Sequence, residues 1–194
     1  MLKQRTLRNS IKASGIGLHS GEQVNIELMP SEPDTGIRFL RTDLQEDLEI
    51  PATAREVGFT TLSTTLGSGT NQISTIEHLL SAIAGLGIDN CLIKVDGPEM
   101  PIMDGSAGPF VFLLQAAGIA EQDVKKKFIK VLKEVKVTRD DAYAFIKPFD
   151  GFKVSFSIST NNNDEFEKGT REEDFLLCQY DMLLSVAFST SHAL

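Results

Sequence analysis

Alternating apolar and polar residues predict short strands in the opening part of the chain. The segment Val24–Leu28 places an apolar side chain at every second position, as a half-buried strand does. Pro30, Pro33 and Gly36 then predict a turn, after which Ile37–Leu40 resumes the strand pattern. Two later runs are also typical of strands, the threonine-rich residues 59–66 and the apolar residues 91–95.

The first strong helical pattern follows Ser74. Ser74 and Glu77 have the spacing of a capping box, in which each side chain accepts a hydrogen bond from the other residue's backbone N–H. Gly85 and Gly87 predict the end of this helix, and a second helix is predicted over residues 106–118. The apolar positions that recur at helical spacing in the first helix are Ile76, Leu79, Leu80 and Ile83.

The second half of the chain returns to strands and then becomes polar. Residues 121–127 predict a solvated linker, and Phe128–Val131, Ala144–Ile146 and Phe152–Phe156 predict an antiparallel meander that begins a second domain. Residues 161–174 contain six acidic and two basic residues and Phe166 as their only apolar side chain. That composition is typical of a solvated, mobile stretch.

Composition narrows the class of protein. Hydrophobic residues make up 41% and charged residues 24%, as in ordinary globular proteins. The net charge of −8 argues against nucleic acid as a partner, and we expect no transmembrane segment because no apolar run reaches 18 residues. Cys91 and Cys178 form neither a Cys-x-x-Cys motif nor a disulfide framework, which favours a reducing, cytoplasmic compartment.

Two features invite a chemical interpretation. Gly15, Gly17 and Gly21 lack the spacing of a dinucleotide-binding fingerprint, so a tight turn between strands is expected there. The adjacent pair Glu77–His78 combines a carboxylate with an imidazole at the positive end of a predicted helix, an arrangement that suits metal-assisted hydrolysis. From residue types alone, the alternative is that Glu77 caps the helix and His78 is a half-buried helix residue.

Five segments, in order and at matching spacing, resemble the zinc-dependent UDP-3-O-acyl-N-acetylglucosamine deacetylases, which act in lipid A synthesis in Gram-negative bacteria. The resemblance covers residues 1 to about 158. The segments are Lys3-Gln4-Arg5-Thr6-Leu7, Ala13-Ser14-Gly15-Ile16-Gly17-Leu18-His19-Ser20-Gly21, Ser74-Thr75-Ile76-Glu77-His78-Leu79, Ala84-Gly85-Leu86-Gly87-Ile88-Asp89-Asn90 and Pro101-Ile102-Met103-Asp104-Gly105-Ser106-Ala107.

The resemblance implies a fold and a set of roles. The implied fold class is α+β: a two-layer sheet-on-helices domain over residues 1–124, followed by a second domain of the same type, incomplete here, over 125–159. The family pattern ends near Ser159, and the abrupt change to an asparagine-rich, acidic sequence indicates an atypical, out-of-frame or disordered tail over 160–194. His78 is implied as a ligand of one zinc ion, and Glu77 as the general base for the metal-bound water that attacks the substrate acetamide. Leu62 and Ser63, in the loop Thr60–Thr64, are implied to contact the substrate.

The sequence also departs from the family. The family's other two zinc ligands lie in a His-Lys-x-x-Asp motif, which this chain lacks, and one histidine is fewer than the three protein ligands of a catalytic zinc. Missing ligands would come from His19, His192, an acid of the tail or a companion chain. Three interpretations therefore stand: a zinc amidase, inactive alone if truncated; a catalytically dead module that binds the nucleotide sugar or its acyl chain; and a non-functional gene fragment.

Overall fold

The protein is described by a computed structural model that covers residues 2–45, 48–140, 142–151, 153–155 and 170–172. It has the α+β composition expected from the sequence. Its strands are β1 Lys3–Leu7, β2 Ile11–Ile16, β3 Gln23–Pro30, β4 Ile37–Arg41, β5 Glu49–Pro51, β6 Leu66–Ser68, β7 Asn71–Ile73, β8 Cys91–Val95, β9 Ile119–Lys125, β10 Val135–Arg139, β11 Ala142–Ile146, β12 Lys153–Ser155 and β13 Thr170–Glu172. Its helices are the 3-10 turn η1 Ala54–Glu56, α1 Glu77–Gly85 and α2 Gly108–Ala117.

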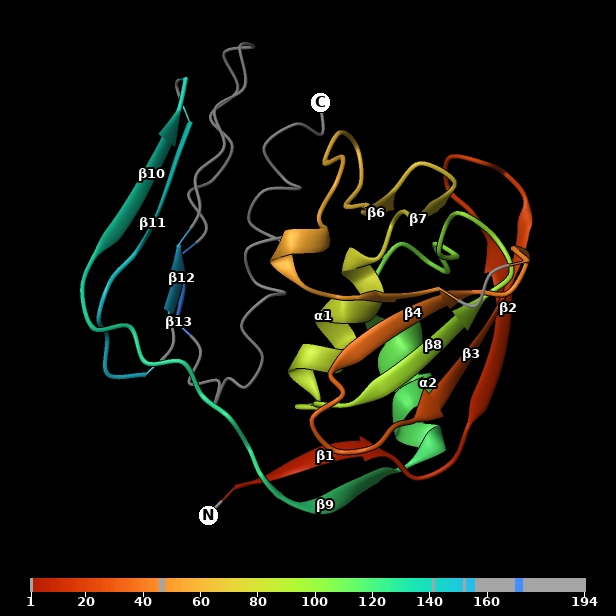
Figure 1. Cartoon of the computed structure of the whole chain (residues 1–194), viewed down its shortest axis with the longest axis horizontal. Helices are drawn as coiled ribbons and strands as arrows, with labels where there is room; N and C mark the ends of the chain where they lie inside the picture. Colours follow the sequence, from red (N-terminus) through yellow and green to blue (C-terminus); the bar gives the residue numbers. More distant parts are fainter. Residues whose placement is uncertain (1, 46–47, 141, 152, 156–169, 173–194) are drawn as a thin grey trace.

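A five-stranded sheet and two helices form two layers. The strand order is β2-β3-β8-β4-β5, and all neighbours are antiparallel except β4 and β8, which run parallel. Figure 1 shows α1 and α2 side by side against one face of this sheet, with the pair β1–β9 below the ends of its central strands, where Thr6 forms a bridge with Asn90 just before β8. None of the helices in the described part has both the length and the apolar character needed to cross a bilayer.

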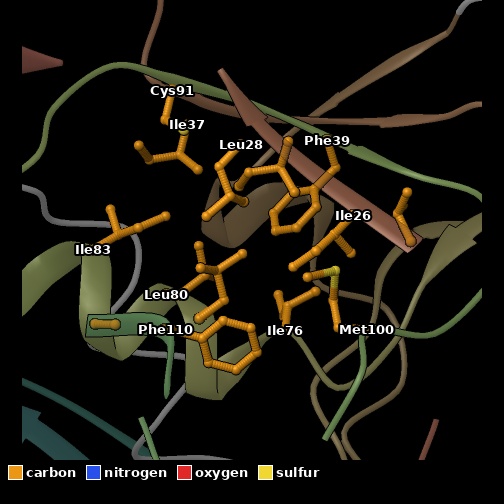
Figure 2. Packing of buried hydrophobic residues seen from close by; sticks show 14 of the residues in the cluster. Ile26, Leu28, Ile37, Phe39, Ile76, Leu80, Ile83, Cys91, Met100 and Phe110 are labelled. Atoms are coloured by element: carbon orange, nitrogen blue, oxygen red, sulfur yellow. The ribbon is translucent and has the colours of Figure 1, made fainter. Parts of the chain in front are cut away.

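The core lies between the sheet and the helices α1 and α2. Val24, Ile26 and Leu28 of β3 are all buried, which confirms the alternation seen in the sequence. Figure 2 shows Ile26, Leu28 and Phe39 from the sheet facing Leu80 and Ile83 of α1. Cys91 belongs to the same cluster, and its burial raises the pKa of the thiol to about 12, so the thiol stays protonated and unreactive at neutral pH.

The predicted capping box of α1 is wrong. The helix begins at Glu77, its cap residue is Ile76, and no side chain caps it. The Ser74 hydroxyl instead donates to the carbonyl of Pro98, and the Glu77 carboxylate accepts from the backbone N–H of Thr64. Tertiary partners have therefore replaced the local hydrogen bonds that the tetrapeptide could have made.

Two strand predictions also fail. Residues 59–65 form a loop, and the strand β6 begins only at Leu66, because Thr65 N–H closes the loop by donating to the carbonyl of Phe59. Phe128–Val131 lies outside any strand, and the hairpin of the second half instead pairs β10 with β11. The apolar residues at 128–131 offered no alternation to fix one face toward a core.

The polar segment 121–127 is mostly a strand rather than a linker. β9 pairs antiparallel with β1 as far as Lys125, and its polar residues are accommodated because this two-stranded sheet is open to solvent on one side. Lys126 is nearly buried beyond the strand, where its ammonium donates to the carbonyl of Gly87 at 2.9 Å and lies 3.2 Å from the Asp89 carboxylate. The prediction that Lys126 belongs to a solvated linker is therefore wrong.

The second half of the chain contributes two small antiparallel pairs. β10 and β11 form a hairpin turned at Asp140, and nearly all their side chains are exposed. β12 pairs with β13, and β13 is the only part of the predicted tail 160–194 that the structure describes. The remaining tail residues, including Phe166, Phe175 and His192, lie outside the described residues.

A buried amide network joins the sheet to the β1–β9 pair. The side-chain amide nitrogen of Asn90 donates to the side-chain oxygens of Gln4 at 2.8 Å and Gln122 at 2.7 Å. The side-chain oxygen of Asn90 accepts from the backbone N–H of Gly36 at 2.9 Å. Asn90 is only 1% exposed. Since a buried polar group that loses its partner is costly, this network favours a single arrangement of the two sheets.

Asn90→Ala should therefore lower the free energy of unfolding by about 3 kcal/mol, because one buried and two half-buried partners lose their hydrogen bonds at once. Urea unfolding followed by circular dichroism measures the change. Asn9→Ala is the matched control: Asn9 is exposed and makes a single side-chain bond, to the carbonyl of Ala117, so its cost should stay below about 1 kcal/mol. Equal losses in the two variants would contradict the network's role.

Candidate active site at the start of the first helix

The loop 58–65 is held against the first turn of α1. Gly58 N–H donates to the carbonyl of Thr65 and Thr65 N–H donates to the carbonyl of Phe59, which closes the loop on itself. At its end, Thr64 N–H donates to Glu77 Oε2 at 3.1 Å. The structure thus brings the predicted general base together with the predicted substrate loop.

The two predicted substrate residues differ in their exposure. Leu62 is 58% exposed at the tip of the loop and has a φ of 63°, whereas Ser63 is buried. A left-handed conformation at a leucine costs energy and is found mostly where the surrounding structure imposes it. The Leu62 side chain is exposed at a backbone conformation that the loop imposes, and it is available to an apolar partner.

Thr64 adds an unusual feature beside Glu77. Its side chain is fully buried, and its hydroxyl has no hydrogen-bond partner among the described residues. A buried hydroxyl without a partner is unfavourable, so a water molecule or a polar ligand that reached it would be stabilised. Thr64 thus presents both this hydroxyl and the backbone N–H that donates to the Glu77 carboxylate.

Glu77 and His78 occupy the first two positions of α1, and both are half-buried. Adjacent residues on a helix point about 100° apart, but at the first turn both side chains can border the space beyond the helix end. The free N–H groups of this turn give it a partial positive charge, which favours an anion there. The buried side chains of Ile76, Leu79 and Leu80 anchor the turn in the core.

A buried carboxylate joins the start of α1 to the β2–β3 turn. Glu99 is 3% exposed. Its Oε1 accepts from the backbone N–H of His19 at 2.9 Å and from the Thr75 hydroxyl at 3.2 Å, and its Oε2 accepts from the backbone N–H of Ser20 at 2.8 Å. Burial by itself raises the pKa of Glu99, but these hydrogen bonds more than offset it, so the pKa lies below its usual value.

The described residues do not form a zinc site. Among them, no three histidine, cysteine or acidic side chains come close enough to hold a metal ion. His78 is the only imidazole at the start of α1; His19 lies on the β2–β3 turn and reaches Glu99 through its backbone, while His192 falls outside the described residues. A single imidazole is an incomplete donor set for zinc, so we derive no chemical step through a metal.

Sequence reasoning missed two residues that shape this site. Glu99 gave a weak signal, since an acid flanked by Pro98 and Met100 in an apolar segment calls for buried partners. Thr75 has a φ of 58°, a conformation that a threonine in the sequence does not predict. The expected tight turn after Gly17 is confirmed, because Gly17 N–H donates to the carbonyl of Glu22 and Gly21 N–H donates to that of Gly17.

Comparison with known proteins decides the family. The family model described as LpxC, UDP-3-O-acyl N-acetylglycosamine deacetylase, matches residues 4–185. The chain belongs to this deacetylase family. The match extends beyond residue 158, to which the resemblance was assigned from the sequence.

Curated relatives of the deacetylase family are closely similar over most of this chain. Proteins named UDP-3-O-acyl-N-acetylglucosamine deacetylase from Hahella chejuensis (strain KCTC 2396), Pseudomonas entomophila (strain L48) and Cellvibrio japonicus (strain Ueda107) are 62%, 60% and 58% identical to it over 158 residues. That alignment covers 81% of this chain and 52% of each relative. The chain spans about half the length of the curated relatives it matches.

The β2–β3 turn should tolerate no side chain at Gly17. A Cβ there would lie 2.2 Å from Ser20 Oγ and 2.6 Å from Glu99 Oε2, so Gly17→Ala should lower the free energy of unfolding by about 1–3 kcal/mol. In the control Gly85→Ala, no atom lies within 4 Å of the added carbon, and the better helix propensity should stabilise the chain by up to about 1 kcal/mol. Thermal unfolding compares the two; a harmless Gly17→Ala would show that the turn and Glu99 are not closely packed.

Proposed function

We propose that this chain carries the catalytic first domain of a UDP-3-O-acyl-N-acetylglucosamine deacetylase, a hydrolase of lipid A biosynthesis. The observation that supports this most is the hydrogen bond between Thr64 N–H and Glu77, which brings the expected base and the expected substrate loop together. The names of the close relatives supply the substrate and the reaction.

In the proposed reaction, water adds to the acetamide carbonyl carbon of the sugar and the carbon–nitrogen bond breaks. Glu77 takes a proton from the attacking water and passes it to the leaving nitrogen, which departs as a free amine while acetate is released. Thr64 N–H donates to Oε2 of Glu77, and the other carboxylate oxygen, which has no hydrogen-bond partner among the described residues, can accept that proton. Leu62 and Ser63 contact the substrate from the loop 58–65.

We further propose that His78 supplies one ligand of a zinc ion. The other ligands must then come from residues outside the described part of this chain, such as His192, or from a companion chain. We retain the division into a first domain over residues 1–124, the start of a second over 125–159 and a tail over 160–194, together with the cytoplasmic location, as parts of this proposal.

A second candidate function is binding of the nucleotide sugar or its acyl chain without turnover. The donor set favours it, because the described residues place one imidazole, rather than three ligands, at the start of α1. Binding without release of acetate is the outcome that separates this function from deacetylation. A gene fragment without function would show neither.

The test incubates the zinc-loaded full chain with UDP-3-O-acyl-N-acetylglucosamine and measures zinc content, substrate binding and free amine. We expect Glu77→Gln to keep zinc but to lower amine release at least about 100-fold, since it removes the proton acceptor. His78→Ala should lose the zinc. Glu27→Gln is the control, because Glu27 lies on β3 beside Lys12, away from α1, and it should leave all three readouts unchanged.

Each outcome of this experiment has a defined meaning. Amine release that depends on Glu77 supports the deacetylase, and substrate binding without amine release supports the binding module. If zinc stays bound in His78→Ala, the ligand role of His78 is wrong. If the wild-type chain neither binds nor hydrolyses the substrate, both proposed functions fail for this chain.

A further inference from the structure

The residue before the helix cap of α1 is held in a conformation that its type disfavours. Thr75 is β-branched, yet its φ of 58° lies in the left-handed region. Such a conformation costs about 1–3 kcal/mol and persists only where other contacts impose it. Thr75 is buried. Because it lies two residues before Glu77, its backbone angles determine the direction of the first turn of α1.

Glu99 provides the contacts that impose this conformation. Its Oε1 accepts from the Thr75 hydroxyl, and the backbone of Ser74, just before Thr75, is bonded to the residues on either side of Glu99. Ser74 N–H donates to the carbonyl of Pro98 at 2.9 Å, and Met100 N–H donates to the carbonyl of Ser74 at 3.0 Å. Residues 74 and 99 therefore lie side by side as a short parallel bridge.

The other side of the Glu99 carboxylate is anchored just as firmly. The backbone N–H groups of His19 and Ser20 donate to its two oxygens, and the β2–β3 turn is itself joined to the segment after Glu99, since Ile102 N–H donates to the carbonyl of Ile16. A charged acceptor of several hydrogen bonds in a buried place forms strong bonds. Glu99 thus connects the rigid edge of the sheet to the start of α1.

We infer that Glu99 is a positioning residue of the proposed active site. By holding Thr75 in its left-handed conformation, the Glu99 carboxylate directs the first turn of α1 so that Glu77 meets the Thr64 amide. The importance of this role for catalysis rests on the proposed function. The coupling itself, from Glu99 through Thr75 to the Thr64–Glu77 hydrogen bond, can be tested without substrate or metal.

The readout is the hydrogen-exchange rate of the Thr64 amide, compared with that of Ile93 in the buried strand β8. In Glu99→Gln, one oxygen becomes an amide nitrogen that cannot accept all of these bonds. Thr64 should then exchange at least about tenfold faster relative to Ile93, as expected for the loss of a hydrogen bond to a charged group. If Glu99 only stabilised the fold as a whole, both amides would accelerate by the same factor, and that result would overturn the proposal.

Asp96→Asn is the matched control. Asp96 also accepts from a backbone N–H, that of Asn25, at 2.7 Å, and from the Asn25 side chain at 2.7 Å, but both bonds go to β3 and neither reaches Thr75 or the start of α1. Its replacement should leave the ratio of the Thr64 and Ile93 exchange rates unchanged. A change of that ratio equal to the one in Glu99→Gln would also contradict the proposal.

A rescue experiment tests the route through Thr75. Glycine adopts a positive φ without strain, so Thr75→Gly should no longer need Glu99 to hold this conformation. In the double variant with Glu99→Gln, the Thr64 amide should regain most of its protection relative to the single Glu99→Gln variant. Failure of this rescue would show that Glu99 does not act through the backbone of Thr75.

If Glu99→Gln does not fold, Thr75→Val supplies the same comparison. Valine keeps the branched shape and removes only the hydroxyl that donates to Glu99. The Thr64 amide should then exchange at least about threefold faster relative to Ile93, because one hydrogen bond to the carboxylate is lost, and an unchanged ratio would overturn the proposal. Because neither amide reports on zinc or substrate, a failure of the proposed function leaves this result unaffected.

Discussion

The start of α1 is fixed by hydrogen bonds from outside the helix, and the candidate site depends on that constraint. An ordinary helix start is satisfied by its own cap residue, but here the cap is Ile76, whose side chain lies in the core. Glu77 is free of capping and is held by Thr64 instead. The Glu77 carboxylate, which a capping box would have used to cap the helix, is therefore available at the start of α1.

This arrangement explains why the core and the site were predictable to different degrees. Period-two and helical spacing identified β3, β4 and α1, because burial on one face imposes those periods on the sequence, and a short apolar run identified β8. Loop 59–65 and the polar strand β9 were misassigned, since a strand former can lie in a loop and a polar run can pair at a sheet edge when tertiary hydrogen bonds decide.

The same contrast holds within the site. Glu77 and His78 were selected from their residue types and from family motifs, and the structure joins Glu77 to the expected substrate loop through Thr64. Glu99 and the left-handed Thr75 were not foreseen, because their importance comes from contacts between segments that lie 24 residues apart. The sequence around Glu99 indicates at most that the acid needs buried partners, and only the structure identifies those partners.

The family membership and the geometry lead to one account. The described part of the chain forms the sheet, the helices and the loop that hold Glu77, and it places one imidazole, that of His78, at the start of α1. Under the proposed function, residues of the described part orient the base, and the zinc site would need further ligands from elsewhere. Orientation of Glu77 by Thr64 is the central claim.

The most direct test of that claim is a scalar coupling measured by NMR across the Thr64–Glu77 hydrogen bond. The chain would carry nitrogen-15 in its threonines and carbon-13 in the carboxyl groups of its glutamates. The account predicts a correlation between the amide nitrogen of Thr64 and the carboxyl carbon of Glu77, which disappears in Thr64→Pro, where no N–H remains. A folded chain with an assigned Thr64 amide and no such correlation would contradict the account.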